Sequence, residues 1–156
     1  MTTWAWDGKM LAADRRISSD NDWTGSTRKI AQRDDGALAA ACGLFVNCQA
    51  ALRWFLAGAD PENVPSFQMT DDWVTMLMVA PDGSLRRLTK GGVASFEAPF
   101  YADGSGGEYA MGAMAMGANA RQAVQVACRF DLASGDGIDT LTLRTKGTGR
   151  GRHRRR

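Results

Sequence analysis

Apolar and polar positions along the first fourteen residues predict a β-hairpin at the start of the chain. Residues 2–6 and 9–13 flank Asp7-Gly8, a pair that favours a two-residue turn between antiparallel strands. With that turn, Asp14 would lie one step beyond the residue that faces Thr2; a loop one residue longer would set Thr2 directly across from Asp14. In both registers the Asp14 backbone lies within about 5–7 Å of Thr2. The pattern therefore predicts a carboxylate beside the N-terminal residue.

The positions that follow predict further strands and three helices. A strand at 28–32 turns at 34–36 into the continuous apolar run 37–42, which is typical of a strand covered on both faces. Additional strands are expected at 73–80, 85–89 and 138–143, a glycine-rich turn at 103–107, and helices at 44–58, about 108–117 and 119–130. Asn119 is the expected N-cap of the last helix. Because strands and helices do not alternate as βαβ repeats, this order predicts two sheets covered by helices.

Length and composition narrow the class of protein. The 156 residues are 44% hydrophobic, which is enough for one compact domain and excludes wholesale disorder. No run approaches the roughly 18 apolar residues of a membrane-spanning helix, and the N-terminus lacks the regions of a secretory signal. The three cysteines form no C-x-x-C pair, which argues against a disulfide scaffold or a zinc site. We therefore expect a cytoplasmic protein that needs no metal or cofactor.

Charge is distributed unevenly along the chain. The formal net charge is +2, but residues 144–156 hold seven of the 19 basic residues and none of the 17 acidic ones. We therefore divide the chain into a mildly acidic domain at 1–143 and a basic, glycine-rich tail at 144–156, which is expected to be disordered. Such a tail can bind nucleic acid through phosphate contacts. The simpler interpretation is a solvated tail without sequence-specific binding.

The chain begins Met-Thr-Thr, which allows a nucleophile at the N-terminus. Methionine is generally removed before a small residue, so the mature chain is expected to start at Thr2. An N-terminal threonine carries a hydroxyl nucleophile and, in its α-amine, a base with a pKa of about 7.7–8.0. This pair could perform acyl transfer in a chain whose one histidine lies in the tail. Many proteins begin Met-Thr, so the N-terminus alone is a weak signal.

Four further features, two residue pairs, one glycine and one turn, have both a chemical and a structural interpretation. Asp14 and Lys29 could form a buried ion pair beside the nucleophile, or be a turn residue bonded to its own arginines and a solvated strand-end lysine. The N–H of Gly43 could point at a developing oxyanion, or Gly43 could simply start a helix. The Gly-Ser-Gly-Gly turn at 104–107 could cradle an oxyanion or phosphate, although it lacks the lysine of a P-loop. Asp131 and Ser134, the last candidates, could orient an amine or simply cap the chain.

In combination these motifs are specific. Their order is Thr-Thr, Ala-Asp-x-Arg, Arg-Lys-Ile, Cys-Gly, Gly-Ser-Gly-Gly-x-Tyr-Ala and Arg-x-Asp-x-x-Ser-Gly. Over residues 2–143 the sequence resembles the proteasome β-subunit family, the threonine peptidases with an N-terminal nucleophile. It is most similar to the bacterial HslV type, because only Met1 precedes Thr2 and no propeptide is visible.

The resemblance implies a fold, an activity and partners. The fold would be α+β, a four-layer αββα sandwich of the N-terminal nucleophile hydrolase type. The chain would be a threonine-type endopeptidase subunit of stacked homo-oligomeric rings, fed with protein substrates by an AAA+ unfoldase that alone uses ATP. The implied roles are nucleophile for Thr2, flanking groups for Asp14 and Lys29, support for Arg16, oxyanion hole for Gly43, and a hydrogen-bond network at the amine for Ser105, Asp131 and Ser134.

Two other functions stay open at this point. A related N-terminal nucleophile hydrolase could act on small amides as a dimer or small oligomer. A catalytically silent ring protein could instead bind nucleic acid through the basic tail, and its binding would then be sensitive to salt.

Overall fold

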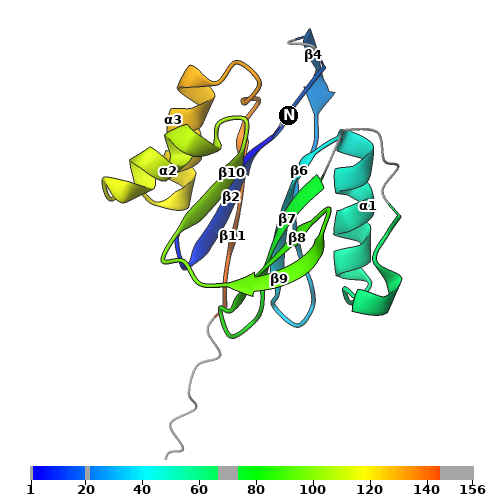
Figure 1. Cartoon of the computed structure of the whole chain (residues 1–156). Coiled ribbons are helices and arrows are strands. Elements are labelled where there is room, and N and C mark those ends of the chain that lie inside the picture. Colours follow the sequence, from blue (N-terminus) through cyan, green and yellow to red (C-terminus); the bar gives the residue numbers. More distant parts are fainter. Residues whose placement is uncertain (1, 20–21, 67–73, 145–156) are drawn as a thin grey trace, which may run out of the picture.

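Two antiparallel β-sheets lie face to face, with helices on both outer sides, in a computed structural model that describes residues 2–19, 22–66 and 74–144 (Figure 1). The first sheet has the order β10 (Tyr101–Gly104), β1 (Thr3–Trp6), β2 (Met10–Asp14) and β11 (Ile138–Thr142). The second has the order β5 (Ile30–Gln32), β6 (Leu38–Gly43), β7 (Val74–Val79), β8 (Leu85–Thr89) and β9 (Gly92–Phe96).

Helix α1 (Phe45–Leu56) covers the second sheet, and α2 (Gly107–Ala115) and α3 (Ala120–Phe130) cover the first (Figure 1). A short 3-10 helix follows α1 at Pro61–Asn63, and a separate hairpin is formed by β3 (Arg16–Ser19) and β4 (Asp22–Ser26). The predicted four-layer αββα sandwich is therefore confirmed.

Strand β6 shows how its apolar run produces the layers. Leu38, Ala40 and Cys42 pack into the layer between the two sheets, whereas Ala39 and Ala41 pack toward α1. Both faces of the strand are thus covered, as the uninterrupted apolar pattern predicts. The layer between the sheets also contains the large side chains of Trp4, Trp6, Leu11 and Leu77.

The layer under α2 and α3 consists mainly of alanines. Its buried members are Ala5, Ala12, Ala102, Ala110, Ala120, Ala123, Val124, Ala127 and Met114. Such small side chains let the helices approach the sheet closely. Asn119 accepts the N–H of Gln122, whose side chain bonds back to the N–H of Asn119, so the predicted N-cap of α3 is confirmed as a capping box.

The register of the first hairpin differs from the predicted one. Trp6 pairs with Leu11, and Thr3 rather than Thr2 lies level with Asp14. The cause is Asp7. Its carboxylate accepts the N–H groups of Lys9 and Met10, which places the residue directly before the two central residues of the turn. Gly8 then takes the first central position, with the positive φ (+93°) that such a turn requires. The centre of the turn moves by one residue, and each pairing therefore moves by two.

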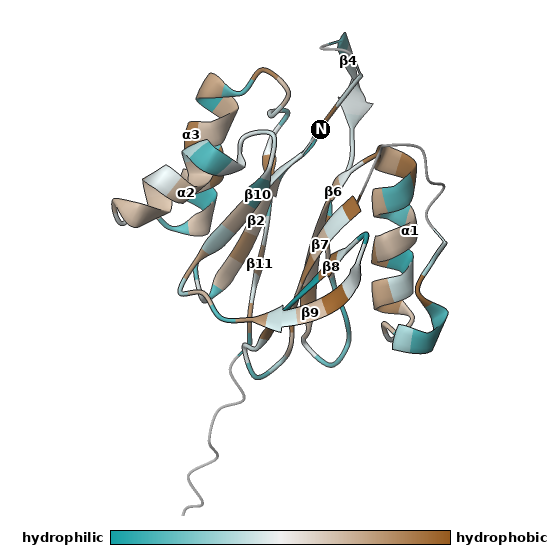
Figure 2. Ribbon diagram, viewed as in Figure 1, coloured by the Kyte–Doolittle hydropathy of each residue, from teal (hydrophilic) through white to brown (hydrophobic). Residues whose placement is uncertain are grey.

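The sequence analysis missed three strand regions: the β3–β4 hairpin, β9 and β10. The hairpin is mostly polar, with β3 half-buried and β4 largely exposed (Figure 2 shows the polar residues of β4), so no apolar alternation marks it. Strand β9 is likewise mostly exposed at the edge of its sheet. The expected strand at 28–32 begins only at Ile30, and the expected helix at 44–58 is shorter, at Phe45–Leu56.

The C-terminal strand leaves the sheet beside the first turn, where the N–H of Leu143 donates to the carbonyl of Lys9 (2.8 Å). The predicted tail at 144–156 lies, apart from Arg144, outside the described residues. Among the described helices, none is long and apolar enough to cross a membrane.

Candidate active site

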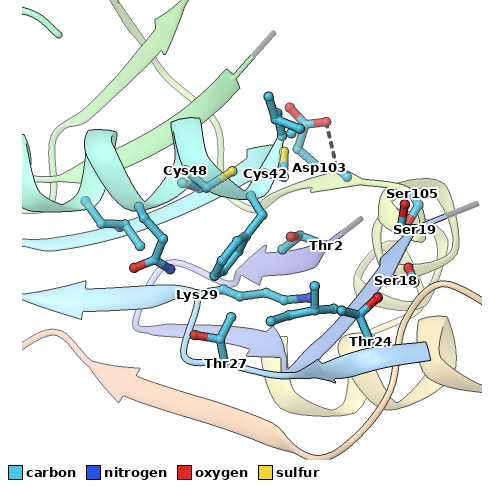
Figure 3. A pocket seen from close by; sticks show the side chains of 18 residues that line it. Thr2, Ser18, Ser19, Thr24, Thr27, Lys29, Cys42, Cys48, Asp103 and Ser105 are labelled. Atoms are coloured by element: carbon cyan, nitrogen blue, oxygen red, sulfur yellow. Dashed lines mark hydrogen bonds between the residues drawn. The ribbon is translucent and has the colours of Figure 1, made fainter. Parts of the chain in front are cut away.

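Thr2 lies just before β1, at the edge of a pocket between the two sheets. The residue is buried (5% exposed), and its carbonyl accepts the N–H of Ser105 at 3.0 Å. The pocket has a volume of about 700 Å³ and is lined by Thr2, Lys29, Gly43 and Ser105, among others (Figure 3). Four of the predicted site residues therefore face one cavity.

Asp14 forms the first of two hydrogen-bond networks next to Thr2. Its side chain is fully buried, at 0% exposed. The oxygen Oδ1 accepts the N–H of Thr3 (2.9 Å) and the ammonium of Lys29 (2.8 Å). The oxygen Oδ2 accepts the N–H groups of Arg16 (3.1 Å) and Gly135 (3.0 Å). A buried carboxylate is stable only when paired and hydrogen-bonded, and here four donors from separate segments satisfy it.

Lys29, directly before β5 of the second sheet, completes this network. Its Nζ donates to Asp14 and to the carbonyl of Arg16 (2.5 Å). Burial lowers the pKa of Lys29 below its usual value, and the neighbouring Asp14 carboxylate opposes that shift only in part. A lysine with a lowered pKa beside a pocket can place positive charge near a nucleophile and can exchange a proton more readily than a solvated lysine.

Asp131 is the centre of the second network, in the loop after α3. Its Oδ2 accepts the hydroxyls of Ser105 and Ser134, each at 2.6 Å, and Oδ1 accepts the N–H of Ala133. Burial alone would raise the pKa of Asp131, but these hydrogen bonds outweigh it and hold the pKa below its usual value. The predicted trio of Ser105, Asp131 and Ser134 therefore forms one connected set around an anionic acceptor.

Both networks meet at Thr3, which the sequence analysis did not single out. Its N–H donates to Asp14, and its Oγ1 shares a hydrogen bond with Ser134 Oγ (2.7 Å) and accepts the N–H of Gly106 (2.8 Å). Thr3 is itself fully buried. The signal in the sequence was the second threonine of Met-Thr-Thr, and the mistaken hairpin register hid its meaning. The residue after the predicted nucleophile is thus held at both its backbone and its side chain.

Glycines let the 104–107 turn close over the N-terminal residues. A Cβ at Gly104 would lie 1.8 Å from the carbonyl oxygen of Thr2, and one at Gly106 would lie 2.5 Å from Thr3 Oγ1. No side chain fits at either position. Gly43 ends β6 with a φ of +128°, a conformation that favours glycine, and brings its backbone to the pocket wall.

Arg16 supports the site from outside the pocket. Its guanidinium donates to the carbonyl of Leu132 (2.8 Å) and to Asp136 (3.2 Å), while its backbone bonds Asp14 and Lys29. It therefore joins the Asp14 network to the loop that carries Asp131 and Ser134.

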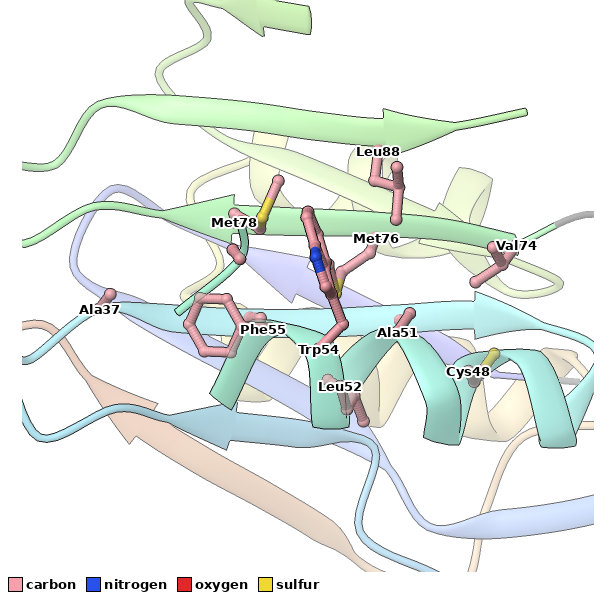
Figure 4. Packing of buried hydrophobic residues seen from close by; sticks show 13 residues of the cluster. Ala37, Cys48, Ala51, Leu52, Trp54, Phe55, Val74, Met76, Met78 and Leu88 are labelled. Carbon is pink, nitrogen blue, oxygen red and sulfur yellow. The ribbon is translucent and has the colours of Figure 1, made fainter. Parts of the chain in front are cut away.

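One wall of the pocket belongs to the hydrophobic core. Cys48 and Leu52 of α1 line the pocket and also pack against the second sheet, with Met76 and Val74 (Figure 4). Burial raises the pKa of the Cys48 thiol to about 11 and also raises that of Cys42. Both thiols are therefore protonated at neutral pH and are poor nucleophiles. The hydroxyl of Thr2 is the better candidate in this cavity.

The layered fold is of the HslV and proteasome type, that of the N-terminal nucleophile hydrolases. Solved structures agree: the chain is similar to Thiobacillus denitrificans BPH in complex with epoxomicin, with a TM-score of 0.65 and 19% identity over 93% of this chain and 99% of that chain. A second structure of Thiobacillus denitrificans BPH has a TM-score of 0.64 and 19% identity, over 94% of this chain and 98% of that chain. Eukaryotic HslV from Trypanosoma brucei has a TM-score of 0.67 and 17% identity, over 91% of this chain and 98% of that chain.

One of these neighbours is an HslV, the type to which the motifs pointed, so the predicted resemblance is confirmed for the fold. No protein-family model matches the sequence, and no curated protein does. The similarity is therefore one of structure.

The Asp14–Lys29 pair should show strong energetic coupling. We expect Asp14→Asn and Lys29→Met each to lower the free energy of unfolding by about 3–5 kcal/mol, because each leaves a buried group without its partner. The double variant should lose much less than the two single losses combined. Urea denaturation of the four proteins measures this coupling.

A surface pair gives the matched control for this cycle. Arg15 Nη1 lies 2.9 Å from Asp139 Oδ2, close to the 2.8 Å of the buried pair, but these side chains are 36% and 23% exposed. The corresponding cycle with Arg15→Met and Asp139→Asn should give a coupling of about 1 kcal/mol or less. Equal coupling in both pairs would contradict the role assigned to burial.

The same substitution at two glycines tests the close contact around Thr3. Gly106→Ala should destabilise the protein by about 1–3 kcal/mol, because the added Cβ meets Thr3 Oγ1 at 2.5 Å and Ala127 Cβ at 2.9 Å. Gly112→Ala, in α2, meets nothing within 4 Å and should stabilise by up to about 1 kcal/mol. Thermal unfolding distinguishes the two, and a neutral Gly106→Ala would show that the turn is not closed on Thr3.

Proposed function

We propose that this chain is a threonine-type endopeptidase subunit, with Thr2 as its nucleophile after removal of Met1. The observation that carries the proposal is that two buried networks hold Thr3 and leave the preceding threonine at the pocket. A residue that is fixed through its neighbour keeps its own hydroxyl and α-amine available for chemistry. That is the geometry an N-terminal nucleophile needs.

The reaction follows from the groups at Thr2. The α-amine takes the proton of the Thr2 hydroxyl, whose oxygen attacks the peptide carbonyl carbon. The N–H of Gly43 stabilises the negative charge that develops on the carbonyl oxygen. The protonated amine then gives its proton to the leaving nitrogen, and the C–N bond breaks to leave an ester on Thr2. Water, deprotonated by the same amine, hydrolyses this ester and releases the acid product.

The two networks would set the electrostatics of this reaction. The ammonium of Lys29 favours the deprotonated form of the Thr2 hydroxyl, and Asp14 holds Lys29 in place. The set of Ser105, Asp131 and Ser134 orients the α-amine and stabilises its protonated form, since Asp131 is an anionic acceptor. Arg16 acts only by positioning both networks.

Assembly and partners form a second part of the proposal. The likeness to HslV supports a ring of identical subunits that degrades proteins, and an ATP-dependent AAA+ unfoldase would deliver those substrates. The chain itself would need no cofactor. The three free cysteines support action in the reducing cytoplasm.

Variants of Thr2 test the proposed function. Thr2→Ala should lower kcat/KM for fluorogenic peptides by about a thousand-fold or more, because it removes the nucleophile. Thr2→Ser keeps a hydroxyl and an α-amine and should retain measurable turnover. Hydrolysis is followed in parallel with peptides, with an unfolded protein and with small amides.

The outcome separates the candidate functions. Cleavage of peptides and unfolded protein that depends on Thr2 supports the endopeptidase. Turnover of small amides alone would favour the amidohydrolase. Peptide hydrolysis that persists unchanged in Thr2→Ala would contradict the proposed nucleophile.

A further inference from the structure

The β3–β4 hairpin forms one wall of the pocket but has little support of its own. Ser18, Ser19 and Thr24 of the hairpin line the pocket across from α1 (Figure 3). In the described part of the chain, the two strands pair only with each other; β3 is half-buried apart from Ser19, and most of β4 is exposed. A two-stranded hairpin is at best marginally stable by itself. The position of this wall must therefore be fixed by contacts outside the hairpin.

Contacts at its base fix one end of the hairpin. The N–H of Thr27 donates to the carbonyl of Arg15 (2.9 Å), and the N–H groups of Arg15 and Arg16 donate to the carbonyl of Gly135 (3.0 Å each). These bonds all lie at the base of the hairpin, where it joins the rest of the domain. They do not fix β4 farther along.

Trp23 supplies the contact farther along β4. Its indole Nε1 donates to Asp136 Oδ2 at 2.5 Å, although the residue is 66% exposed. The other oxygen of Asp136 accepts from the Arg16 guanidinium (3.2 Å). One carboxylate thus connects β3 and β4 to the same loop.

That loop is the one that carries the second network of the site. Asp136 has a φ of +63°, a left-handed conformation that aspartate tolerates better than most residues. At Gly135 a Cβ would lie 2.9 Å from the Arg16 guanidinium, so only glycine leaves room for that side chain. Ser134 follows Asp131 by three residues and bonds to Thr3. The loop therefore connects the pocket wall with the residues next to the nucleophile.

We propose that Trp23, acting through Asp136, is a positioning residue that holds the β3–β4 hairpin as the wall against which an extended peptide substrate binds. This inference rests on the proposed peptidase function. Loss of the indole hydrogen bond frees the hairpin and weakens peptide binding. It leaves the Thr2 hydroxyl and both networks in place, so the chemical step is affected much less.

The test compares two conservative aromatic substitutions. Trp23→Phe keeps an aromatic ring and removes the N–H, and we expect KM for a fluorogenic peptide to rise about ten-fold with kcat changed less than two-fold. Tyr109→Phe, at a residue of α2 that is 47% exposed and away from the pocket lining, is the matched control and should leave KM unchanged. Asp136→Asn, which keeps an acceptor oxygen for the indole and tolerates the same left-handed backbone, should have a smaller effect than Trp23→Phe.

Binding measured without turnover separates this inference from the proposed function. In a Thr2→Ala background, the Kd of a fluorescently labelled peptide should also rise about ten-fold with Trp23→Phe. If that Kd rises while the wild-type chain cleaves nothing, the positioning role stands and the peptidase proposal fails. If the peptide does not bind, if Kd and KM stay unchanged, or if only kcat falls, the positioning role is overturned.

Discussion

The buried carboxylate of Asp14 is the constraint on which the rest of the site depends. It lies in the first sheet, and its ion-pair partner Lys29 reaches it from the segment that enters the second sheet. Removing such a charge from water is costly, so the fold must bring all four donors to it at once. The donors from Thr3, Arg16 and Gly135 belong to the chain start, the projecting hairpin and the loop after α3. The Arg16 donor is local, but satisfying this one charge joins the chain start, the segment that carries Lys29 and the loop after α3.

This constraint explains why the candidate nucleophile lies where it does. The networks around Asp14 and Asp131 hold Thr3 from two directions, and the glycine turn at 104–107 closes over the backbone of Thr2. The pocket then has a rigid apolar wall, because α1 is packed into the core, and a second wall of hydroxyls on the less supported hairpin. Chemistry and substrate binding thus rely on different parts of the fold, which meet at the loop around Asp136.

Much of this arrangement could be predicted from the sequence, and the failures have definite physical causes. The continuous apolar run of β6 and the capping sequence at Asn119 are strong local signals, and both were predicted. The eight site residues could be named because their motifs occur in one order. The predicted register of the first hairpin was wrong because aspartate can either be a central residue of the turn or precede it. The sequence pattern does not distinguish the two, and Asp7 precedes the turn. Thr3 and Trp23 were missed because their partners, Ser134 and Asp136, are more than a hundred residues away.

The most direct test of the central claim is to find where a peptide epoxyketone attaches. This probe forms two bonds, one to a hydroxyl oxygen and one to a free amine on the same residue, so it reports an N-terminal nucleophile and no ordinary serine or threonine. After incubation and trypsin digestion, tandem mass spectrometry should find one adduct on the peptide at 2–9, with Met1 absent and the adduct at Thr2. Retention of Met1, or an adduct at any other residue, would contradict the account.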